Sequence, residues 1–319
     1  MSGAAFDNVL DSCLAVRPGE QVVLLTDDGT DVAVVDGLRE GIGARGAVPV
    51  VARMPMPRLP GSEPPTTVAA MMFEAGAIIE LTSLFIGSCL ARRRATGNGA
   101  RYLAMPGVRL ETFREGGPLT VDFGGLRAGV EAVGDAWTRA LTFRLTTPGG
   151  TDLRGSIEGR PGRVLHGLAC SAGDYMAPPD IEAGAAPLEG SANGVVVVDA
   201  DLLFMGRGPL PEPVVLHIHD GELADVEGAE RHRLTDMIDR CGDRRMSNLA
   251  EVSMAFNPAG LVCAVAMETE SSLGTAHIAL GNSLAYGGVV DAVAHLDCVM
   301  RDATLELDGE KVLIAGVTA

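Results

Sequence analysis

The sequence has few cysteines and a deficit of basic side chains. Its six cysteines are scattered over 319 residues without a Cys-x-x-Cys pair, which argues against a disulfide framework or an all-cysteine zinc site. Lysine and arginine total 25 against 42 aspartates and glutamates, giving a net charge of −17. A chain this acidic would be repelled by a phosphate backbone, so we expect no nucleic-acid partner.

Long apolar runs and targeting signals are also missing. No uncharged stretch approaches the roughly 18 apolar residues of a membrane span. Asp7 and Asp11 stand where a signal peptide would need basic residues followed by an apolar core. The first predicted strand is followed by "TDDGTD", which lacks the G-x-G-x-x-G spacing of a dinucleotide site. We therefore expect a soluble cytoplasmic protein without a membrane partner.

The first third of the chain alternates strand-like and helix-like patterns. "QVVLLTDD" and "VPVVARM" are apolar runs typical of buried strands, and "AIIELTS" and "RYLAMPG" predict two more. Between them, "TDVAVVDGLREGIGARGA" and "PPTTVAAMMFEAG" predict helices, each with start signals. Strand–helix alternation with short links predicts an α/β domain over residues 1–125, with a mostly parallel, three-layer sheet.

The pattern changes after a glycine-rich segment, "FREGGPLTVDFGGLRAG", which we interpret as a break between domains. Beyond it, "ALTFRLTTPGGTDLRGSIEGRPG" predicts a hairpin with a Pro-Gly-Gly turn, and "PVVLHIHDGELADVEG" predicts another. One helix, "AERHRLTDMIDRCG", interrupts these strands. We predict a larger α+β domain over residues 126–319.

The six histidines can be weighed one by one. His217 and His219 have metal-ligand spacing, but the Asp-Gly turn that follows favours a structural role for both. His232 lies in a charged helix and is expected to be exposed. His166, in "RVLHGLACSAGD", is compatible with a structural role or with a contact to substrate.

His295 and Asp297 are stronger candidates, because residues two apart in a strand share a face. His277 and Glu251 lie in other apolar segments, where an unpaired charge is costly. A divalent metal would offset that cost, and imidazole and carboxylate are ligands for zinc, iron or manganese. These four residues could therefore form a mixed nitrogen–oxygen site. The alternative is a buried His–Asp hydrogen bond with Glu251 on the surface.

The segments "TDLRGSIEGR", "EGSANGVVVVDADLLF", "LAEVSMAFNP", "LGTAHIALGNSLAYGG" and "AHLDCVM" resemble, in this order, the aminopeptidase T family of metallopeptidases. That group includes divergent members such as 2,5-dihydroxypyridine dioxygenase. The resemblance implies metal ligation by Glu251, His277, His295 and Asp297. It also implies a catalytic carboxylate near Glu270, in a segment that we expect to be a loop, and a homo-oligomer, a dimer or larger.

The sequence departs from the family at two positions. The peptidases carry Gly-Glu ahead of "EGSANG", and that glutamate helps to hold a second metal, whereas here Ala185 follows Gly184. A two-metal site would then need Glu182 or Glu189 as a replacement. Leu284 occupies the position of an expected tyrosine, and Tyr286 comes two residues later. We therefore expect one divalent metal ion (Fe, Mn, Zn or Co) per subunit.

Two enzymatic functions and one non-catalytic function follow from these observations. The first is an aminopeptidase-like hydrolase that cleaves an amide or C–N bond in a small molecule or short peptide. Glu270 would be its general base for a metal-activated water, and His166 and Tyr286 would contact substrate. The second is a non-haem Fe(II) dioxygenase that cleaves a hydroxylated N-heterocycle such as a dihydroxypyridine. The third is a non-catalytic binding or assembly protein.

Overall fold

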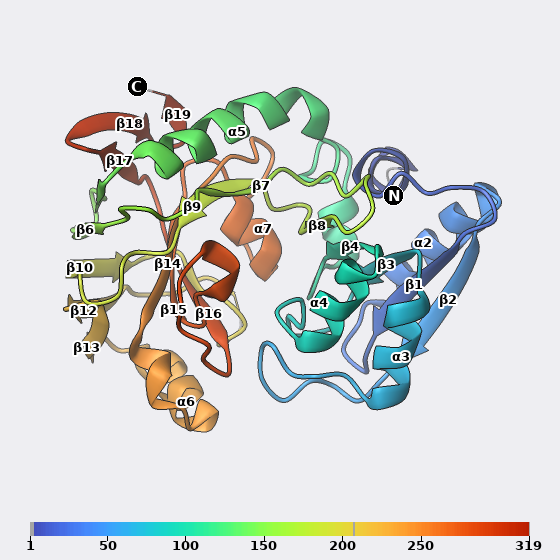
Figure 1. Ribbon diagram of the computed structural model, residues 1–319, viewed down its shortest axis with the longest axis horizontal. Helices are drawn as coiled ribbons and strands as arrows, with labels where there is room; N and C mark the ends of the chain where they lie inside the picture. The colour runs from blue at the N-terminus through green and yellow to red at the C-terminus, as the bar shows by residue number, and fades with distance from the viewer. Residues whose placement is uncertain (1–2, 207, 319) are drawn as a thin grey trace. The chain divides into compact units, whose positions relative to one another are not determined.

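The computed structural model describes residues 3–206 and 208–318 (Figure 1). The chain divides into two compact units that alternate along the sequence. The first unit extends to Arg127 and also includes Leu165–Asp180 and Pro258–Gly260; the second consists of the other segments. The predicted domain boundary at residue 125 stays a prediction, because compactness does not show that either part folds alone.

A parallel sheet forms the centre of the first unit, as the sequence predicts. Its strand order is β2-β1-β3-β4-β8, and its strands pair in parallel throughout the described residues. β1 is buried at five of its six positions, in agreement with the apolar run that predicted it. The strands are β1 (Gln21–Thr26), β2 (Val48–Arg53), β3 (Ala77–Glu80), β4 (Arg101–Ala104) and β8 (Tyr175–Met176).

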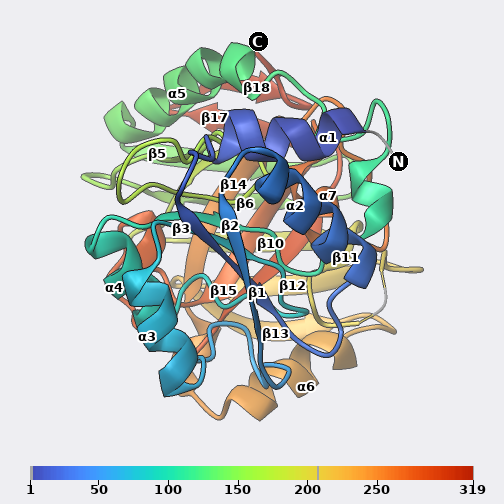
Figure 2. The same ribbon diagram turned by 90° about the vertical axis from the view of Figure 1, so that its right-hand side faces the viewer.

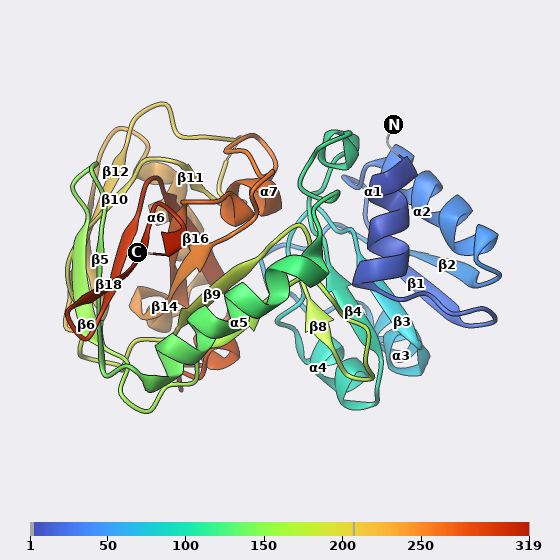
Figure 3. The ribbon, with the colours of Figure 1, turned by 90° about the horizontal axis from the view of Figure 1, so that it is seen from above.

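Helices cover both faces of this sheet. Figures 2 and 3 show α1 and α2 on one face and α3 and α4 on the other, which confirms the predicted three layers. A π-helical turn, η1 (Asn8–Cys13), continues directly from α1. The helices are α1 (Gly3–Asp7), α2 (Val32–Ala44), α3 (Thr66–Glu74) and α4 (Leu90–Gly97), with a 3-10 turn η2 (Leu110–Phe113).

The chain passes from the first unit to the second at Arg127–Ala128, within the glycine-rich segment, and the second half of that segment begins a long helix, α5 (Phe123–Arg139). The sequence did not predict this helix, because glycine lowers helix propensity, but glycine does not exclude a helix whose apolar residues are buried. Phe123, Val130 and Trp137 recur at intervals of seven and all are buried. A Cβ on Gly134 would lie 2.2 Å from the Val164 side chain, so this glycine allows α5 to approach the segment that contains Val164 closely.

The second unit contains two further sheets, which lie alongside each other in Figure 3. The eight-stranded sheet has the order β13-β12-β10-β6-β5-β17-β18-β19 and is antiparallel throughout its described pairings. Both predicted hairpins are confirmed in it. The Asp220-Gly221 turn has φ of 48° and 75°, the left-handed pair that a two-residue hairpin requires. The strands are β5 (Thr142–Thr146), β6 (Asp152–Ser156), β10 (Asn193–Val198), β12 (Val214–His219), β13 (Glu222–Glu227), β17 (Thr304–Leu307), β18 (Glu310–Ile314) and β19 (Val317–Thr318).

The six-stranded sheet, of order β11-β16-β15-β14-β9-β7, carries most of the predicted site residues. One of its faces buries Val252, Ile278 and Cys298 completely. Its strands are β7 (Arg163–Leu165), β9 (Glu182–Ala185), β11 (Asp201–Leu202), β14 (Leu249–Ala255), β15 (Ala276–Gly281) and β16 (His295–Met300). The helices of this unit are α6 (His232–Cys241) and α7 (Ala266–Ser271), with 3-10 turns η3 (Arg244–Ser247) and η4 (Leu284–Tyr286).

No helix in the described ranges is long and apolar enough to cross a membrane.

Candidate metal centre

The register of the six-stranded sheet places acidic and imidazole side chains on one face. Ala279 pairs with both Glu251 and Asp297, and residues directly opposite each other in an antiparallel sheet point the same way. His277 and His295 lie two positions from Ala279 and Asp297 respectively, so they share that face. Three neighbouring strands thus bring together the four residues that the sequence proposed as ligands.

A β-bulge determines which way Glu251 points. The register of β14 against β15 shifts between Leu249, which pairs with Leu280, and Glu251, which pairs with Ala279. Leu249 and Glu251 would share a face in a regular strand, but the extra residue places them on opposite faces. The bulge therefore directs the Glu251 carboxylate toward His277 while Leu249 stays with the apolar face.

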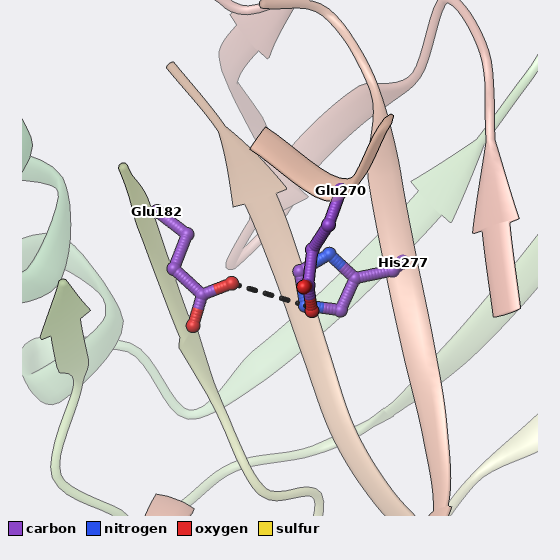
Figure 4. A group of neighbouring side chains, drawn as sticks. All are labelled: Glu182, Glu270 and His277. Carbon is purple, nitrogen blue, oxygen red and sulfur yellow. Dashed lines mark ion pairs between the residues drawn. The ribbon is translucent and has the colours of Figure 1, made fainter. Parts of the chain in front are cut away.

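His277 lies among three carboxylates. Its Nε2 is 2.9 Å from Glu251 Oε1, 3.1 Å from Glu182 Oε2 and 3.7 Å from Glu270 Oε1. Figure 4 shows Glu182 and Glu270 approaching the ring from different elements, β9 and α7. His277, Glu182 and Glu251 are all fully or almost fully buried. Glu270 lies in a short helix, so the expectation of a loop there was wrong.

His295 completes the other side of the cluster. Its Nε2 is 2.9 Å from Glu251 Oε2 and 3.2 Å from Asp297 Oδ1. Its Nδ1 lies 2.7 Å from the Asn282 carbonyl and donates its proton to that oxygen. In the neutral ring this leaves the Nε2 lone pair directed at the carboxylates, which is the arrangement of a metal-binding histidine.

In Glu182 and Glu251, one carboxylate oxygen accepts a hydrogen bond from a hydroxyl group and the other oxygen faces a histidine of the cluster. Ser253 donates to Glu251 Oε1 at 2.5 Å, and the Tyr286 hydroxyl donates to Glu182 Oε1 at 2.5 Å. In the described part of the chain, Glu182 Oε2, Glu251 Oε2 and Asp297 Oδ1 are buried without a hydrogen bond. Buried acceptors in this state are costly unless something positive lies beside them.

The closely spaced carboxylates shift the pKa values of the histidines and of Glu270. Burial disfavours protonation of His277, but Glu182 and Glu251 outweigh it and raise the pKa of the ring well above its ordinary value. Asp297 and Glu251 likewise overcome burial and raise the pKa of His295. Burial, and then the Asp297 carboxylate, raise the pKa of Glu270 well above its usual range. The cluster therefore takes up protons where it has no other cation.

The donor set fits a divalent metal ion. Two groups of three residues each offer ligand atoms within 4.8 Å of one another, and both groups include His277. One group adds Glu251 and Asp297, and the other adds Glu182 and Glu270. Imidazole nitrogen with carboxylate oxygen suits iron, manganese, zinc and cobalt rather than a soft-metal site. The alternative with Glu251 on the surface is wrong, because Glu251 is completely buried.

The structure corrects the reasoning about Ala185. Ala185 pairs with Val252 and so points to the opposite face of the sheet from the cluster. Gly184 pairs with Ser253, and Glu182, two residues before it, lies on the cluster face. Glu182 is therefore the acid of this strand that reaches the cluster. Glu189 does not, because it forms an ion pair with Arg160.

The remaining candidates are distributed over the chain. Tyr286 belongs to the cluster: its ring stacks on His295 with centroids 5.7 Å apart. His166 lies in the first unit, buried, with Nδ1 accepting from the Leu168 amide, and its contact with substrate stays a prediction. His217 pairs with Glu227 at 2.8 Å, while His219 is exposed beside Asp220. His232 is exposed, as expected.

Comparison with known proteins identifies the family. The model for the 2,5-dihydroxypyridine 5,6-dioxygenase family matches residues 2–319. The chain belongs to this family. A solved structure of 2,5-dihydroxypyridine dioxygenase from Pseudomonas putida KT2440 has a TM-score of 0.81 at 18% identity, with 100% of this chain and 98% of that chain covered. Wild-type AmpT from Thermus thermophilus has a TM-score of 0.69 at 16% identity, with 99% and 98% covered.

Comparison with curated protein sequences gives no match. The two solved structures share the fold of this chain, and their names confirm both parts of the resemblance that the sequence motifs suggested. Family membership favours the dioxygenase alternative over the hydrolase that we placed first. The cluster and the family together indicate a metal-dependent enzyme.

Proposed function

We propose that this protein is a metal-dependent dioxygenase that cleaves the ring of a hydroxylated N-heterocycle, of which 2,5-dihydroxypyridine is the first to test. The observation that carries this proposal is a group of buried carboxylate oxygens that face the Nε2 atoms of His277 and His295 and have no other partner in the described structure, in a chain of the 2,5-dihydroxypyridine 5,6-dioxygenase family. Two histidines with carboxylates are the ligand type of non-haem Fe(II) oxygenases.

The metal would be held by two histidines, His277 and His295, and two carboxylates, Glu251 and Asp297. A bound redox-active metal supplies the open coordination positions and electron transfer that ring cleavage by dioxygen requires. The chain itself contributes orientation: Ser253 and the Asn282 carbonyl fix the directions of Glu251 and His295.

Glu270 is the candidate for moving a proton of the substrate. It lies outside the Glu251, His277 and Asp297 group but within 3.7 Å of His277. Burial, and then the Asp297 carboxylate, raise its pKa, which suits a carboxyl that exchanges a proton with a ring hydroxyl. Tyr286, stacked on His295, presents an aromatic surface next to the cluster and would contact the heterocycle.

Hydrolysis stays a second candidate because of the Glu182, Glu270 and His277 group. In that case the Nε2 of His277 and the Glu182 carboxylate would hold the ion, and Glu270 would serve as general base toward an activated water. The two functions differ in what they consume. A dioxygenase takes up one dioxygen for each ring it opens, whereas a hydrolase takes up none.

The deciding experiment uses metal-free protein reconstituted anaerobically with Fe(II), and separately with Zn(II) or Co(II). With 2,5-dihydroxypyridine and Fe(II), we expect oxygen uptake equal to the loss of substrate. Asp297→Asn should abolish it, and His217→Gln, a histidine outside the cluster, should retain it. Turnover of an aminoacyl amide with Zn(II) or Co(II), without oxygen uptake, would establish the hydrolase. Absence of stoichiometric metal from the reconstituted protein would contradict both and favour a non-catalytic role.

A further inference from the structure

Tyr286 contacts the candidate metal centre at two points. Its hydroxyl donates to Glu182 Oε1, which leaves Glu182 Oε2 directed at His277. Its ring is nearly parallel to that of His295, at 8°. A displacement of this one side chain would therefore alter the orientation of a carboxylate and of an imidazole at opposite sides of the cluster.

The segment that carries Tyr286, residues 283–290, which we call the Tyr286 loop, has little local structure to hold it. Ser283 and Val290 close its base, with the Ser283 amide donating to the Val290 carbonyl at 3.0 Å. Within it lie a three-residue 3-10 turn and two hydrogen bonds to Ser283, from the Gly288 amide to the carbonyl and from the Val290 amide to the hydroxyl. Its apolar side chains contribute little burial, since Val289 is 72% exposed. These bonds close the loop on Ser283, but a short 3-10 turn is not stable by itself, so contacts from outside fix the position of the loop tip.

Three contacts from outside hold the tip of the Tyr286 loop. The Ala186 amide donates to the Tyr286 carbonyl at 3.2 Å. Arg160 Nη1 donates to the Gly287 carbonyl at 2.6 Å. The Val289 amide donates to Glu189 Oε1 at 3.0 Å.

Arg160 and Glu189 act as one unit. Arg160 Nη2 forms an ion pair with Glu189 Oε2, so the pair spans the loop from Gly287 to Val289. Arg160 is buried, and its Nε has no hydrogen bond in the described structure. A buried guanidinium is costly, and removing its partner would leave that charge uncompensated. Separating the two side chains would therefore destabilise the protein, which favours the observed geometry.

The chain next to Arg160 also leaves the Tyr286 loop no space to move inward. Gly287 has φ of +84°, and a Cβ there would lie 2.6 Å from Pro161 Cδ. The loop backbone thus turns directly against the residue that follows Arg160. The guanidinium on one side and Pro161 on the other define the position of the peptide that follows Tyr286.

We propose that Arg160 and Glu189 are positioning residues for the metal centre, and that they act through Tyr286. This inference rests on the proposed function, because it concerns the affinity of the cluster for a metal ion. Neither residue touches the cluster itself. Their effect is to hold Tyr286 where it fixes the free oxygen of Glu182 and the ring plane of His295. Removal of an outer partner that hydrogen-bonds a ligand changes metal affinity by about 10-fold to 100-fold, so residues that act through Tyr286 should have a smaller effect.

The test is a double-mutant cycle on metal affinity, measured by competition between the protein and a chelating dye for Co(II). We expect Arg160→Gln to weaken binding by about 3-fold to 10-fold, less than the loss on removing Tyr286 itself. In a Tyr286→Leu background, which has already lost both contacts, Arg160→Gln should change affinity by less than about 2-fold. Arg144→Gln, which breaks the exposed pair with Asp152 in the same unit, is the matched control and should have no effect.

An equal loss in both backgrounds would overturn the inference, since the pair would then act independently of Tyr286. Unchanged affinity in Arg160→Gln alone would also overturn it. If that variant does not fold, Glu189→Gln replaces it in the double-mutant cycle with Tyr286→Leu, because glutamine keeps an acceptor for the Val289 amide. Hydrogen exchange of residues 283–290 in the metal-free protein should rise in either variant. The two proposals can fail separately. If the wild type binds no Co(II) but exchange still rises in the variants, the proposed function is contradicted, whereas the role of Arg160 and Glu189 in holding the Tyr286 loop is supported.

Discussion

Buried glutamates occur in both units of this protein, and their surroundings differ. Glu80, at the end of β3, is completely buried, and both of its oxygens accept hydrogen bonds: Oε1 from the Ile86 amide and from Thr82, and Oε2 from the Tyr102 hydroxyl. Glu182 and Glu251 are buried to the same extent, yet each keeps one oxygen without a donor.

This difference separates a structural acid from a candidate ligand. Burial alone is costly for any carboxylate, and both regions bear that cost. In the first unit, protein donors satisfy the group completely. In the second unit, each carboxylate has a single donor that orients it, while its free oxygen faces a histidine. Sites of the second kind are incomplete without a cation or a proton.

The largest expected effect on metal binding comes from removing His277, the residue that both groups of candidate ligands share. His277→Gln should weaken metal binding by well over the roughly 100-fold expected for an outer partner. His217→Gln, which removes a histidine paired with Glu227 on the sheet surface, is the control and should keep wild-type metal content. Metal analysis after desalting measures both, and stoichiometric metal in His277→Gln would contradict the assignment.

The next largest effect is expected for Glu80→Gln, and it concerns the pH dependence of the free energy of unfolding rather than metal affinity. Burial, against three hydrogen bonds that lower it, raises the pKa of Glu80 to about 7. Between pH 4.5 and 7 the native state therefore holds a proton that the unfolded state releases, so stability falls as pH rises through this range. The wild type should lose about 3 kcal/mol relative to Glu80→Gln over that interval.

Denaturant unfolding at several pH values measures this loss. Glu74→Gln, an exposed glutamate of the same unit, should follow the wild type. Wild type and Glu80→Gln losing stability in parallel would show that Glu80 ionises normally in the folded protein.

Metal removal should destabilise the protein by a similar amount. An ion present at 100 times its dissociation constant stabilises the native state by about 2.7 kcal/mol. Carboxylates raise the pKa of His277 and of His295, so protons compete with the metal and its affinity should rise with pH. The increase in melting temperature on adding Fe(II) or Co(II) should be larger at pH 8 than at pH 6. The opposite order would contradict the proton-for-metal exchange, and Glu80→Gln should keep the wild-type response.

The smallest expected effect tests the single donor on Glu251. Ser253→Ala removes the hydrogen bond to Oε1 and should cost about 1 kcal/mol of stability. Metal affinity should fall by less than about 10-fold, because Glu251 keeps its position in the strand. Ser191→Ala, which loses a hydrogen bond to the Leu188 carbonyl, should lower stability similarly without changing metal affinity. Equal metal affinities in both variants would show that Ser253 has no orienting role.

Much of the candidate centre could be anticipated from local pattern. His295 and Asp297 share a face because strand side chains alternate with a period of two. Charged residues in apolar strands pointed to Glu251 and His277, since such positions are expensive unless paired. These inferences needed only a few neighbouring residues each, and all four side chains lie together in the structure.

Glu182 was not assigned to the cluster because its place depends on register. Sequence comparison drew attention to Ala185, yet pairing with Val252 turns that residue away, and pairing of Gly184 with Ser253 brings Glu182 in. Helix α5 was missed for a different reason. Its glycines weaken the local signal, and the burial of Phe123 and Trp137 that stabilises it comes from the folded protein.

The sequence by itself determined the alternation of strands and helices in the first unit, the two hairpins and the chemistry of the candidate ligands, because each depends on residues close together in the chain. The tertiary structure decided which acids face the cluster. The bulge before Glu251 and the register of β9 against β14 set those directions. A one-residue change in either would turn a side chain to the opposite face, and pairing partners far apart in the chain are what select the register.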